Sequence, residues 1–242
     1  MDVDVDVDVD VMSVSMNTRG DRSTAVLEAV DLYRFYHAGD DETLALRGVS
    51  FTLYPGEIVA VTGPSGSGKS TLLACLAGLD EPDGGSVRIS GQRMSRQPES
   101  VRAALRATTV GMLFQTGNLL DHLSVEQNVL LAQRLAGHVD RARIAHLLEE
   151  VGLTDRSSAT PSSLSGGEAA RAGVAVALAN HPVVILADEP TGELDEVTAQ
   201  RIVNLLRKHA DNGAAVLMVT HNTDVAASAD REINLFDGRL AS

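Results

Sequence analysis

The segment Gly63–Ser70, GPSGSGKS, places glycines, a lysine and a hydroxyl residue at the spacing G-x-x-x-x-G-K-[ST]. Glycines let the backbone curl so that successive N–H groups point at a phosphate, at the positive end of the following helix. Lys69 supplies a cation for β- and γ-phosphates, and the Ser70 hydroxyl can ligate Mg²⁺. An apolar strand before the loop and an apolar helix after it favour nucleotide binding over an ordinary Gly/Ser turn. The predicted contacts are Gly63, Pro64, Ser65, Gly66, Ser67, Gly68, Lys69, Ser70 and Thr71.

A second candidate site is the segment VVILADE, in which an apolar run ends at Asp188 and Glu189. An acid at the carboxyl end of such a buried strand lies beside the phosphate loop, where Asp188 can hold the water shell of Mg²⁺. Glu189 can orient or deprotonate an attacking water. Two solvated turn carboxylates are the alternative, which the preceding apolar residues disfavour. The pair predicts nucleotide hydrolysis.

Nothing in the segment LSGGEAAR is typical of a catalytic nucleophile, a metal site or a disulfide. Ser165, Gly166 and Gly167 stand just before a helix expected from about residue 168 to residue 179. A glycine pair at that place lets backbone N–H groups and a helix N-terminus approach an anion closely. Ser165 is also expected to cap the helix. We interpret the segment as a second anion-binding site.

The elements around these residues follow an α/β pattern. TAVLEAVDLYRFY and LALRGVSFTLY are predicted strands joined by a polar turn, EIVAVTG is a buried strand, and GGSVRISGQRM is a short one. After VGMLFQ the pattern becomes helical, and strands and helices then alternate from VVILADE to EINLFDG. The outer portions predict a largely parallel sheet, and the middle predicts a helical insertion.

Composition limits the possible functions. The chain has 242 residues, 44% of them hydrophobic, which suits one large domain or a domain with an inserted lobe. A formal charge of −13 argues against a nucleic-acid partner. Cys75 is the single cysteine, expected to be buried on a helix. The chain lacks both an apolar run of roughly 18 residues and a signal-peptide pattern, so it is expected to stay in the cytoplasm.

The first residues alternate Asp and Val, MDVDVDVDVDV, which in isolation is a strand signal. Five like charges would then line one face, so we expect residues 1–22 to be a disordered acidic tail. An acidic docking motif is the alternative.

Taken together, the motifs resemble those of ATP-binding subunits of ABC transporters, over essentially residues 25 to 240. The resemblance rests on GPSGSGKST, FQ, LSGGE, VVILADE, ELD and TH in the family's order, with LSGGE the most specific. It implies an α/β P-loop NTPase (RecA-like) core with an antiparallel β subdomain and an inserted α-helical subdomain. The expected divisions are an ATPase domain over 23–242, with its core in 23–115 and 171–242 and its helical subdomain in 116–170.

The family also assigns roles to single positions. Two subunits pack head to tail, and each ATP lies between one phosphate loop and the partner's signature residues, here Ser165, Gly166 and Gly167. Tyr36 matches the aromatic residue that stacks on adenine, with core packing as the alternative. The other implied assignments are Gln115 at Mg²⁺ or water, Asp195 in the loop crossing the dimer interface, and His221 at the γ-phosphate. The other six histidines are expected to be surface or core residues.

Some positions depart from the family pattern. Ala169 and Ala170 stand where two glutamines are common, Val176 replaces a frequent arginine, and Glu193 stands where Asn is frequent. Each departure leaves the proposed catalytic groups in place, so activity is expected with a different rate.

The resulting prediction is an ATP-hydrolysing subunit with Glu189, His221 and Lys69 as catalytic residues and Ser70, Gln115 and Asp188 as metal ligands. It would bind ATP and Mg²⁺, form a homodimer and drive a separate membrane permease from the cytoplasmic face. The sequence around Gln115 is most similar to sequences of the subfamily that serves lipoprotein release, macrolide export and cell division. A regulatory ATP switch without transport is the alternative, while ABC proteins of DNA repair or translation are disfavoured.

Overall fold

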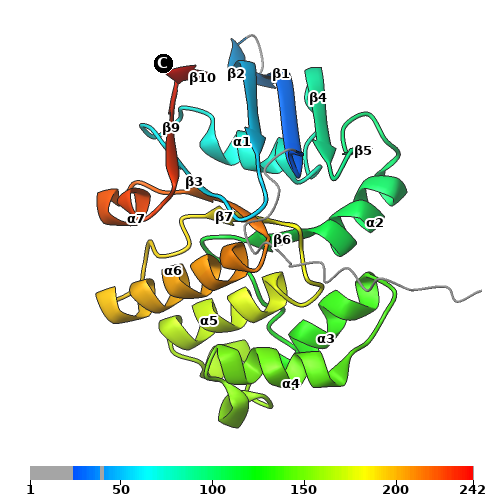
Figure 1. The fold of residues 1–242 in the computed structure, drawn as a ribbon, viewed down its shortest axis with the longest axis vertical. Helices are drawn as coiled ribbons and strands as arrows, with labels where there is room; N and C mark the ends of the chain where they lie inside the picture. Colours follow the sequence, from blue (N-terminus) through cyan, green and yellow to red (C-terminus); the bar gives the residue numbers. More distant parts are fainter. Residues whose placement is uncertain (1–23, 39–40, 242) are drawn as a thin grey trace, which may run out of the picture.

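The computed structural model describes residues 24–38 and 41–241. The predicted acidic tail, residues 1–22, therefore lies outside the described residues. Within them, two sheets and the helices around them form an α/β architecture, as the sequence predicts (Figure 1).

The larger sheet has six strands in the order β10-β9-β3-β8-β7-β6. Strands β9, β3, β8, β7 and β6 are parallel to their neighbours, and β10 pairs antiparallel with β9. All five residues of β8 are buried, as expected for a parallel strand covered on both faces. The strands are β3 (Ile58–Thr62), β6 (Val110–Leu113), β7 (Val184–Asp188), β8 (Ala215–Val219), β9 (Arg231–Phe236) and β10 (Arg239–Ala241).

The smaller sheet is antiparallel, with the order β2-β1-β4-β5. Its strand β2 packs against α1 and also contacts β10 and β8 of the larger sheet. Its strands are β1 (Leu27–Ala38), β2 (Asp41–Leu53), β4 (Gly84–Ile89) and β5 (Gln92–Arg93). The first core cluster joins this sheet, α1 and one face of the larger sheet.

The helices α5 and α6 cover the opposite face of the larger sheet, and α3 and α4 lie beyond α5 (Figure 1). A second core cluster fills the space between these helices and the sheet. Neighbouring residues of one strand divide between the clusters: Ile185 belongs to the second and Leu186 to the first, as the strand period of two requires. The helices are α1 (Lys69–Leu76), α2 (Glu99–Thr109), α3 (Val125–Leu135), α4 (Arg141–Glu150), α5 (Gly166–Ala177), α6 (Glu196–Asp211) and α7 (Thr223–Ala227), with 3₁₀ turns at Thr154–Arg156 and Pro161–Ser163.

The structure differs from the sequence-based expectation at α2 and β10, which the residue pattern did not predict. Leu105 is the one buried residue of α2, in which Val101 is the one other large apolar side chain. Arg102 and Arg106 on this helix form ion pairs with Glu99, and Arg102 also pairs with Glu81. The divisions at residues 23, 115 and 171 stay predictions. In the described part of the chain, none of the helices has the length and apolar character required to span a membrane.

Candidate nucleotide site

The phosphate loop connects β3 to α1, so the helix N-terminus faces the space above the loop. Gly68 precedes α1 at φ 103°, a left-handed conformation that favours glycine. A Cβ atom at Gly63, whose φ is 143°, would stand 2.0 Å from the carbonyl oxygen of Leu235. Lys69 Nζ donates to the carbonyl oxygens of Gly63 and Pro64 at 2.8 and 2.9 Å, which holds its ammonium group over the loop.

Asp188 ends β7, and β8 lies between β7 and β3 in the sheet. Because these strands are parallel, their carboxyl ends meet at one edge, which brings Asp188 to the phosphate loop. Burial raises the pKa of Asp188, and a hydrogen bond from Ser70 opposes that rise. Ser70 and Asp188 are therefore close neighbours, and their shared role as metal ligands stays a prediction.

Glu189 follows at φ 46°, an uncommon left-handed conformation for a residue with a side chain. Its N–H donates to the carbonyl of Val219 at 3.0 Å, which fixes the turn to the end of β8. His221 Nδ1 lies 2.8 Å from Glu189 Oε1, while the imidazole itself is largely exposed. A strained turn of this kind persists where the surrounding structure determines it, and such turns concentrate at functional sites.

A cavity of about 520 Å³ brings most of the predicted nucleotide residues together. Ser67 is instead buried and absent from the lining, and its N–H donates to the carbonyl of Pro64 within the loop. The predicted residues that line the cavity are Tyr36, Gly63, Ser65, Gly66, Gly68, Lys69, Ser70, Thr71, Gln115, Asp188, Glu189 and His221.

Sequence reasoning missed the wall of this cavity that β2 and the turn between β9 and β10 supply. Thr43, Leu44, Ala45 and Arg47 come from β2, and Arg47 forms an ion pair of 2.9 Å with Asp237. The Asp237–Gly238 dipeptide is an ordinary hairpin signal. It indicates the turn but not the cavity that the turn lines.

The LSGGE segment lies outside that cavity. Ser165 caps α5 by accepting from the N–H of Glu168, whose carboxylate in turn accepts from the N–H of Ser165. The predicted cap is confirmed, and α5 begins two residues earlier than expected. Asp195 likewise caps α6 and accepts from the Thr198 hydroxyl at 2.7 Å.

The signature glycines and Asp195 are neighbours on one surface. A Cβ atom at Gly167 would stand 3.2 Å from the side chain of Thr198, whereas a Cβ at Gly166 would meet open space. Ser165, Gly166 and Asp195 are all exposed. The predicted ATP contacts beyond the phosphate loop thus fall into two groups. Tyr36 and Gln115 line the phosphate-loop cavity, and the second group is absent from its lining: Ser165, Gly166, Gly167 and Asp195.

A model of the ABC transporter family matches residues 46–192, which is more than half of the chain. The chain belongs to the ABC transporter family. It is 44% identical over 218 residues to an uncharacterized ABC transporter ATP-binding protein of Thermotoga maritima, covering 89% of this chain and 93% of that protein. It is 42% identical over 220 residues to the macrolide export ATP-binding/permease protein MacB of Escherichia coli K12. That match covers 90% of this chain but only 34% of MacB, so the chain spans about a third of that relative's length.

Solved structures agree with this assignment. A dimeric structure of a bacterial ABC transporter cassette, MJ0796, matches with a TM-score of 0.84 and 34% identity over 89% of this chain and 97% of that one. A dimeric post-hydrolysis state of the same cassette, bound to ADP and Pi, matches equally well. The predicted fold and the prediction of an ATP-binding, ATP-hydrolysing subunit of an ABC transporter are confirmed.

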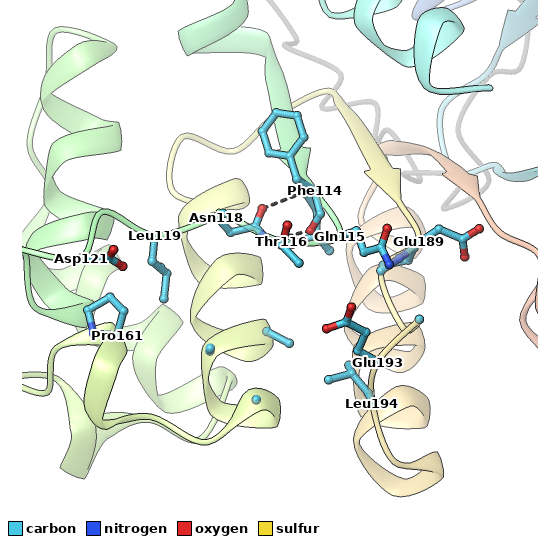
Figure 2. Close-up of a pocket in the computed structure, with 17 residues that line it drawn as sticks. Phe114, Gln115, Thr116, Asn118, Leu119, Asp121, Pro161, Glu189, Glu193 and Leu194 are labelled. Carbon is cyan, nitrogen blue, oxygen red and sulfur yellow. Dashed lines mark hydrogen bonds between the residues drawn. The ribbon is translucent and has the colours of Figure 1, made fainter. Parts of the chain in front are cut away.

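In this ABC transporter subunit, the departures from the family pattern gather in two places. Ala169, Ala170 and Glu193 line a second cavity of about 280 Å³ beside Gln115 and Glu189. Figure 2 shows the Glu193 carboxylate directed into this cavity, whereas the Glu189 carboxylate points the other way. The fourth departure, Val176, lines a separate groove beside Phe114. The sequence indicated these departures but not that three of them line one cavity.

The donor set at the phosphate loop fits Mg²⁺. Ser70, Asp188 and Gln115 offer oxygen ligands on one wall of the cavity. Mg²⁺ is commonly held by one or two carboxylates together with substrate phosphates and waters, so a protein-only cage is not required. The described residues contain no cluster of three or more His, Cys, Asp or Glu able to hold a metal.

Proposed function

We propose that this chain hydrolyses MgATP in the phosphate-loop cavity and thereby drives conformational changes in a membrane permease. The observation that carries the proposal is that cavity, because one space holds the loop, its lysine, two strand-end carboxylates and a histidine. Backbone N–H groups and Lys69 bind the phosphates, and Tyr36 stacks on the base. Glu189 positions and deprotonates water, while His221 holds that carboxylate and reaches toward the γ-phosphate.

Ser70, Asp188 and Gln115 hold Mg²⁺ in this proposal. The ion, when bound, neutralises charge that develops on the transferred phosphoryl group. The hydrogen bond from Ser70 to Asp188 already aligns two of the donors. Gln115 lines both this cavity and the second one, so it is placed to relay the state of the γ-phosphate toward the helical part of the chain.

A second copy of the chain completes the site. Ser165, Gly166, Gly167 and Asp195 are absent from the lining of the cavity at the phosphate loop of their own chain, and Ser165, Gly166 and Asp195 are exposed. The N-terminus of α5 has two glycines and no side chain that blocks an approaching phosphate at Gly166. A head-to-tail homodimer would place this surface on the partner's ATP, and both solved structures of the MJ0796 cassette described above are dimeric.

The permease partner is proposed to contact a groove of about 610 Å³ between α2 and α3. Exposed Leu79, Phe114 and Leu135 line it, so its surface is largely apolar. Phe114 precedes Gln115 directly, which links the groove to the ATP site by one peptide bond. MacB carries an ATP-binding part and a permease part in one chain, and this chain matches about a third of it. The proposed occupant is therefore a cytoplasmic segment of a permease, with the subunit peripheral on the inner membrane face.

Two lysines allow a matched test of the ATP site. Lys69→Arg keeps the charge but changes the head group that reaches the loop carbonyls, whereas Lys208→Arg changes the chain's other lysine, on α6. Both purified proteins are assayed for Mg²⁺-dependent phosphate release from ATP. We expect loss of about 10²-fold or more for Lys69→Arg and near-normal turnover for Lys208→Arg. Normal turnover in Lys69→Arg would contradict the proposal.

The groove is tested by cysteine crosslinking in cells. Cys75 is buried, whereas Leu135 is exposed. Among the described residues, Leu135→Cys would therefore carry the one accessible thiol. We expect Leu135→Cys to form adducts with an integral membrane protein, and Gln200→Cys, exposed on α6, to form none. Equal adducts from both positions, or none from Leu135→Cys, would place the permease elsewhere.

A further inference from the structure

Tyr36 is held by a basic and an acidic side chain. Its hydroxyl donates to Asp80 Oδ2 at 2.7 Å. Arg34, two residues earlier on β1, donates from Nε to the same oxygen at 2.8 Å, and its Nη2 lies 2.8 Å from Asp80 Oδ1. A two-pronged arginine–carboxylate pair fixes orientation as well as distance. The three side chains form a closed unit, which we call the Tyr36 clamp.

Arg34 also covers one face of the tyrosine ring. Its guanidinium carbon lies 4.7 Å from the ring centroid, within the range of a cation–π contact. Tyr36 lines the phosphate-loop cavity, whereas Arg34 is absent from the lining. One ring face is thus covered by a guanidinium that is not part of the cavity lining. A flat base can stack only on the opposite face.

Asp83 anchors the backbone of the clamp. Its Oδ2 accepts from Arg34 Nη1 at 3.1 Å and from the N–H of Phe35 at 2.8 Å. The N–H of Asp83 donates to the carbonyl of Tyr33 at 2.9 Å. The strand is thus held on both sides of Arg34, and the ring is held by the hydrogen bond from its hydroxyl to Asp80.

The charges favour this arrangement at neutral pH. Burial alone would raise the pKa of Asp80, but hydrogen bonds from Arg34 and Tyr36 bring it below its ordinary value. Burial, and then the hydrogen bond to Asp80, raise the pKa of Tyr36. Asp80 consequently stays ionised and Tyr36 stays protonated, as the donor–acceptor geometry requires.

The clamp is attached to the helix that carries the phosphate site. Asp80 lies just beyond α1, and its N–H donates to the carbonyl of Ala74 in that helix at 3.1 Å. Lys69 begins the same helix. The position of the ring relative to the phosphate loop is therefore set through α1.

We propose that Arg34 and Asp80 are positioning residues for nucleotide binding, which keep one face of Tyr36 open to the base at a fixed distance from the phosphate loop. This inference rests on the proposed ATP site. A preformed platform binds more tightly because the ring loses less freedom when the base stacks. The clamp acts on the base and not on the phosphates, so the two parts of the ligand can be tested separately.

The test compares ATP with inorganic triphosphate, which has the phosphates but no base. Dissociation constants are measured by calorimetry for Arg34→Met and Asp80→Asn, and the melting temperature of each variant is recorded. We expect ATP affinity to fall about 3- to 10-fold in both variants, as for partial loss of a base–aromatic stack, and triphosphate affinity to stay constant. Arg102→Met is the matched control, because Arg102 pairs with Glu81 at 2.9 Å and makes no contact with Tyr36 among those the structure shows.

A double-mutant cycle separates this inference from the proposed function. In the Tyr36→Ala background, Arg34→Met should cost no further ATP affinity, because the ring it positions is gone. If Tyr36→Ala weakens ATP but Arg34→Met does not, the clamp is wrong and the ATP site stands. If Tyr36→Ala has no effect, the base assignment in the proposed function fails. An equal loss of triphosphate affinity, or an undiminished effect without the ring, would show that Arg34 acts on the fold instead.

Discussion

His221 Nδ1 lies 2.8 Å from Glu189 Oε1, although 32 residues separate them in the sequence. The contact arises because β7 and β8 are adjacent and parallel, so the residues that follow them meet at one edge of the sheet. The N–H of His221 also approaches Glu189 Oε2 at 3.4 Å. The carboxylate is thus oriented by both the ring and the backbone of one residue. It points into the cavity that holds Lys69.

The first prediction concerns Glu189→Gln. The amide keeps the size of the side chain but cannot take a proton from water, so hydrolysis should fall about 10²-fold or more while MgATP binding persists. Since formation of the ATP-bound dimer would no longer be followed by hydrolysis, that dimer should accumulate. Size-exclusion chromatography with ATP measures that dimer. Glu149→Gln, which changes an exposed carboxylate on α4, is the control and should behave as wild type. A monomeric Glu189→Gln protein with normal turnover would exclude Glu189 as the base.

The second prediction concerns His221→Ala. Loss of the imidazole removes the partner of Glu189 Oε1, so turnover should fall about 10- to 10²-fold with ATP affinity nearly unchanged. His122→Ala, at an exposed histidine away from the cavity, should leave turnover unchanged. Steady-state kinetics separates the two effects. A rise in KM at constant kcat would mean that His221 binds ATP without aiding hydrolysis.

The third prediction concerns the buried charge of Asp188. Burial raises the pKa of Asp188, so the folded protein binds its proton more readily than the unfolded chain does. The ionised carboxylate therefore costs stability at neutral pH, and this cost shrinks as the pH falls toward the raised pKa. Asp188→Asn should increase the melting temperature of the ligand-free protein by roughly 1–3 °C, because it removes that charge while keeping an acceptor for Ser70. Scanning calorimetry at several pH values should show that the difference in melting temperature between Asp188→Asn and wild type becomes smaller as the pH is lowered.

The same substitution should impair magnesium binding. The amide that replaces the Asp188 carboxylate would offer a neutral oxygen in place of a charged one, so the Mg²⁺ concentration for half-maximal hydrolysis should rise about 10-fold or more. A series of measurements at decreasing pH should show wild-type Mg²⁺ affinity weakening as the pH falls toward the raised pKa of Asp188. A variant with unchanged Mg²⁺ dependence would remove Asp188 from the proposed ligands.

Local sequence signals were sufficient for the phosphate loop, the strand before Asp188 and the cap at Ser165. Each depends on residues within a few positions of one another, so spacing alone carries the information. The parallel sheet also followed, since alternating strands and helices permit few arrangements. The roles assigned to Gln115 and Asp195 came from the family resemblance instead, and they stay predictions.

Long-range contacts could not be predicted in the same way. Arg34 and Asp80 are 46 positions apart, and neither belongs to a spacing pattern that indicates their pairing. Ala170 and Glu193 meet across a cavity only because α5 lies beside the turn after β7. The helix α2 was missed, and its polar attachments reach residues far away in the sequence: Arg102 pairs with Glu81, and Arg106 donates to the carbonyl oxygens of Ala77 and Gly78. Such features depend on the assembled fold.

The last prediction tests the two-molecule site through Gly166. A side chain at this position meets open space within its own chain, unlike one at Gly167, which would press on Thr198. Gly166→Asp also places an acid in the first turn of α5, which favours the helix, so the melting temperature should not fall. In the dimer, the new carboxylate would face the partner's γ-phosphate. In that partly dehydrated space the carboxylate and the phosphate repel each other by several kcal/mol as an order of magnitude, so the ATP-bound dimer should not form.

Complementation then distinguishes a shared site from an effect within one chain. The Gly166→Asp protein keeps its own phosphate loop, so a monomer should still bind ATP. Mixed with Lys69→Ala, it can form a heterodimer in which one site carries both defects and the other carries neither. We expect this mixture to recover part of the hydrolysis that each variant lacks alone. If heterodimers form, as checked by pull-down of differently tagged chains, and hydrolysis stays absent, then either ATP is not shared between Lys69 of one chain and Gly166 of the other, or the two sites must act together. A Gly166→Asp dimer that forms normally with ATP would settle the matter against the shared site, because the carboxylate would then have no phosphate opposite it.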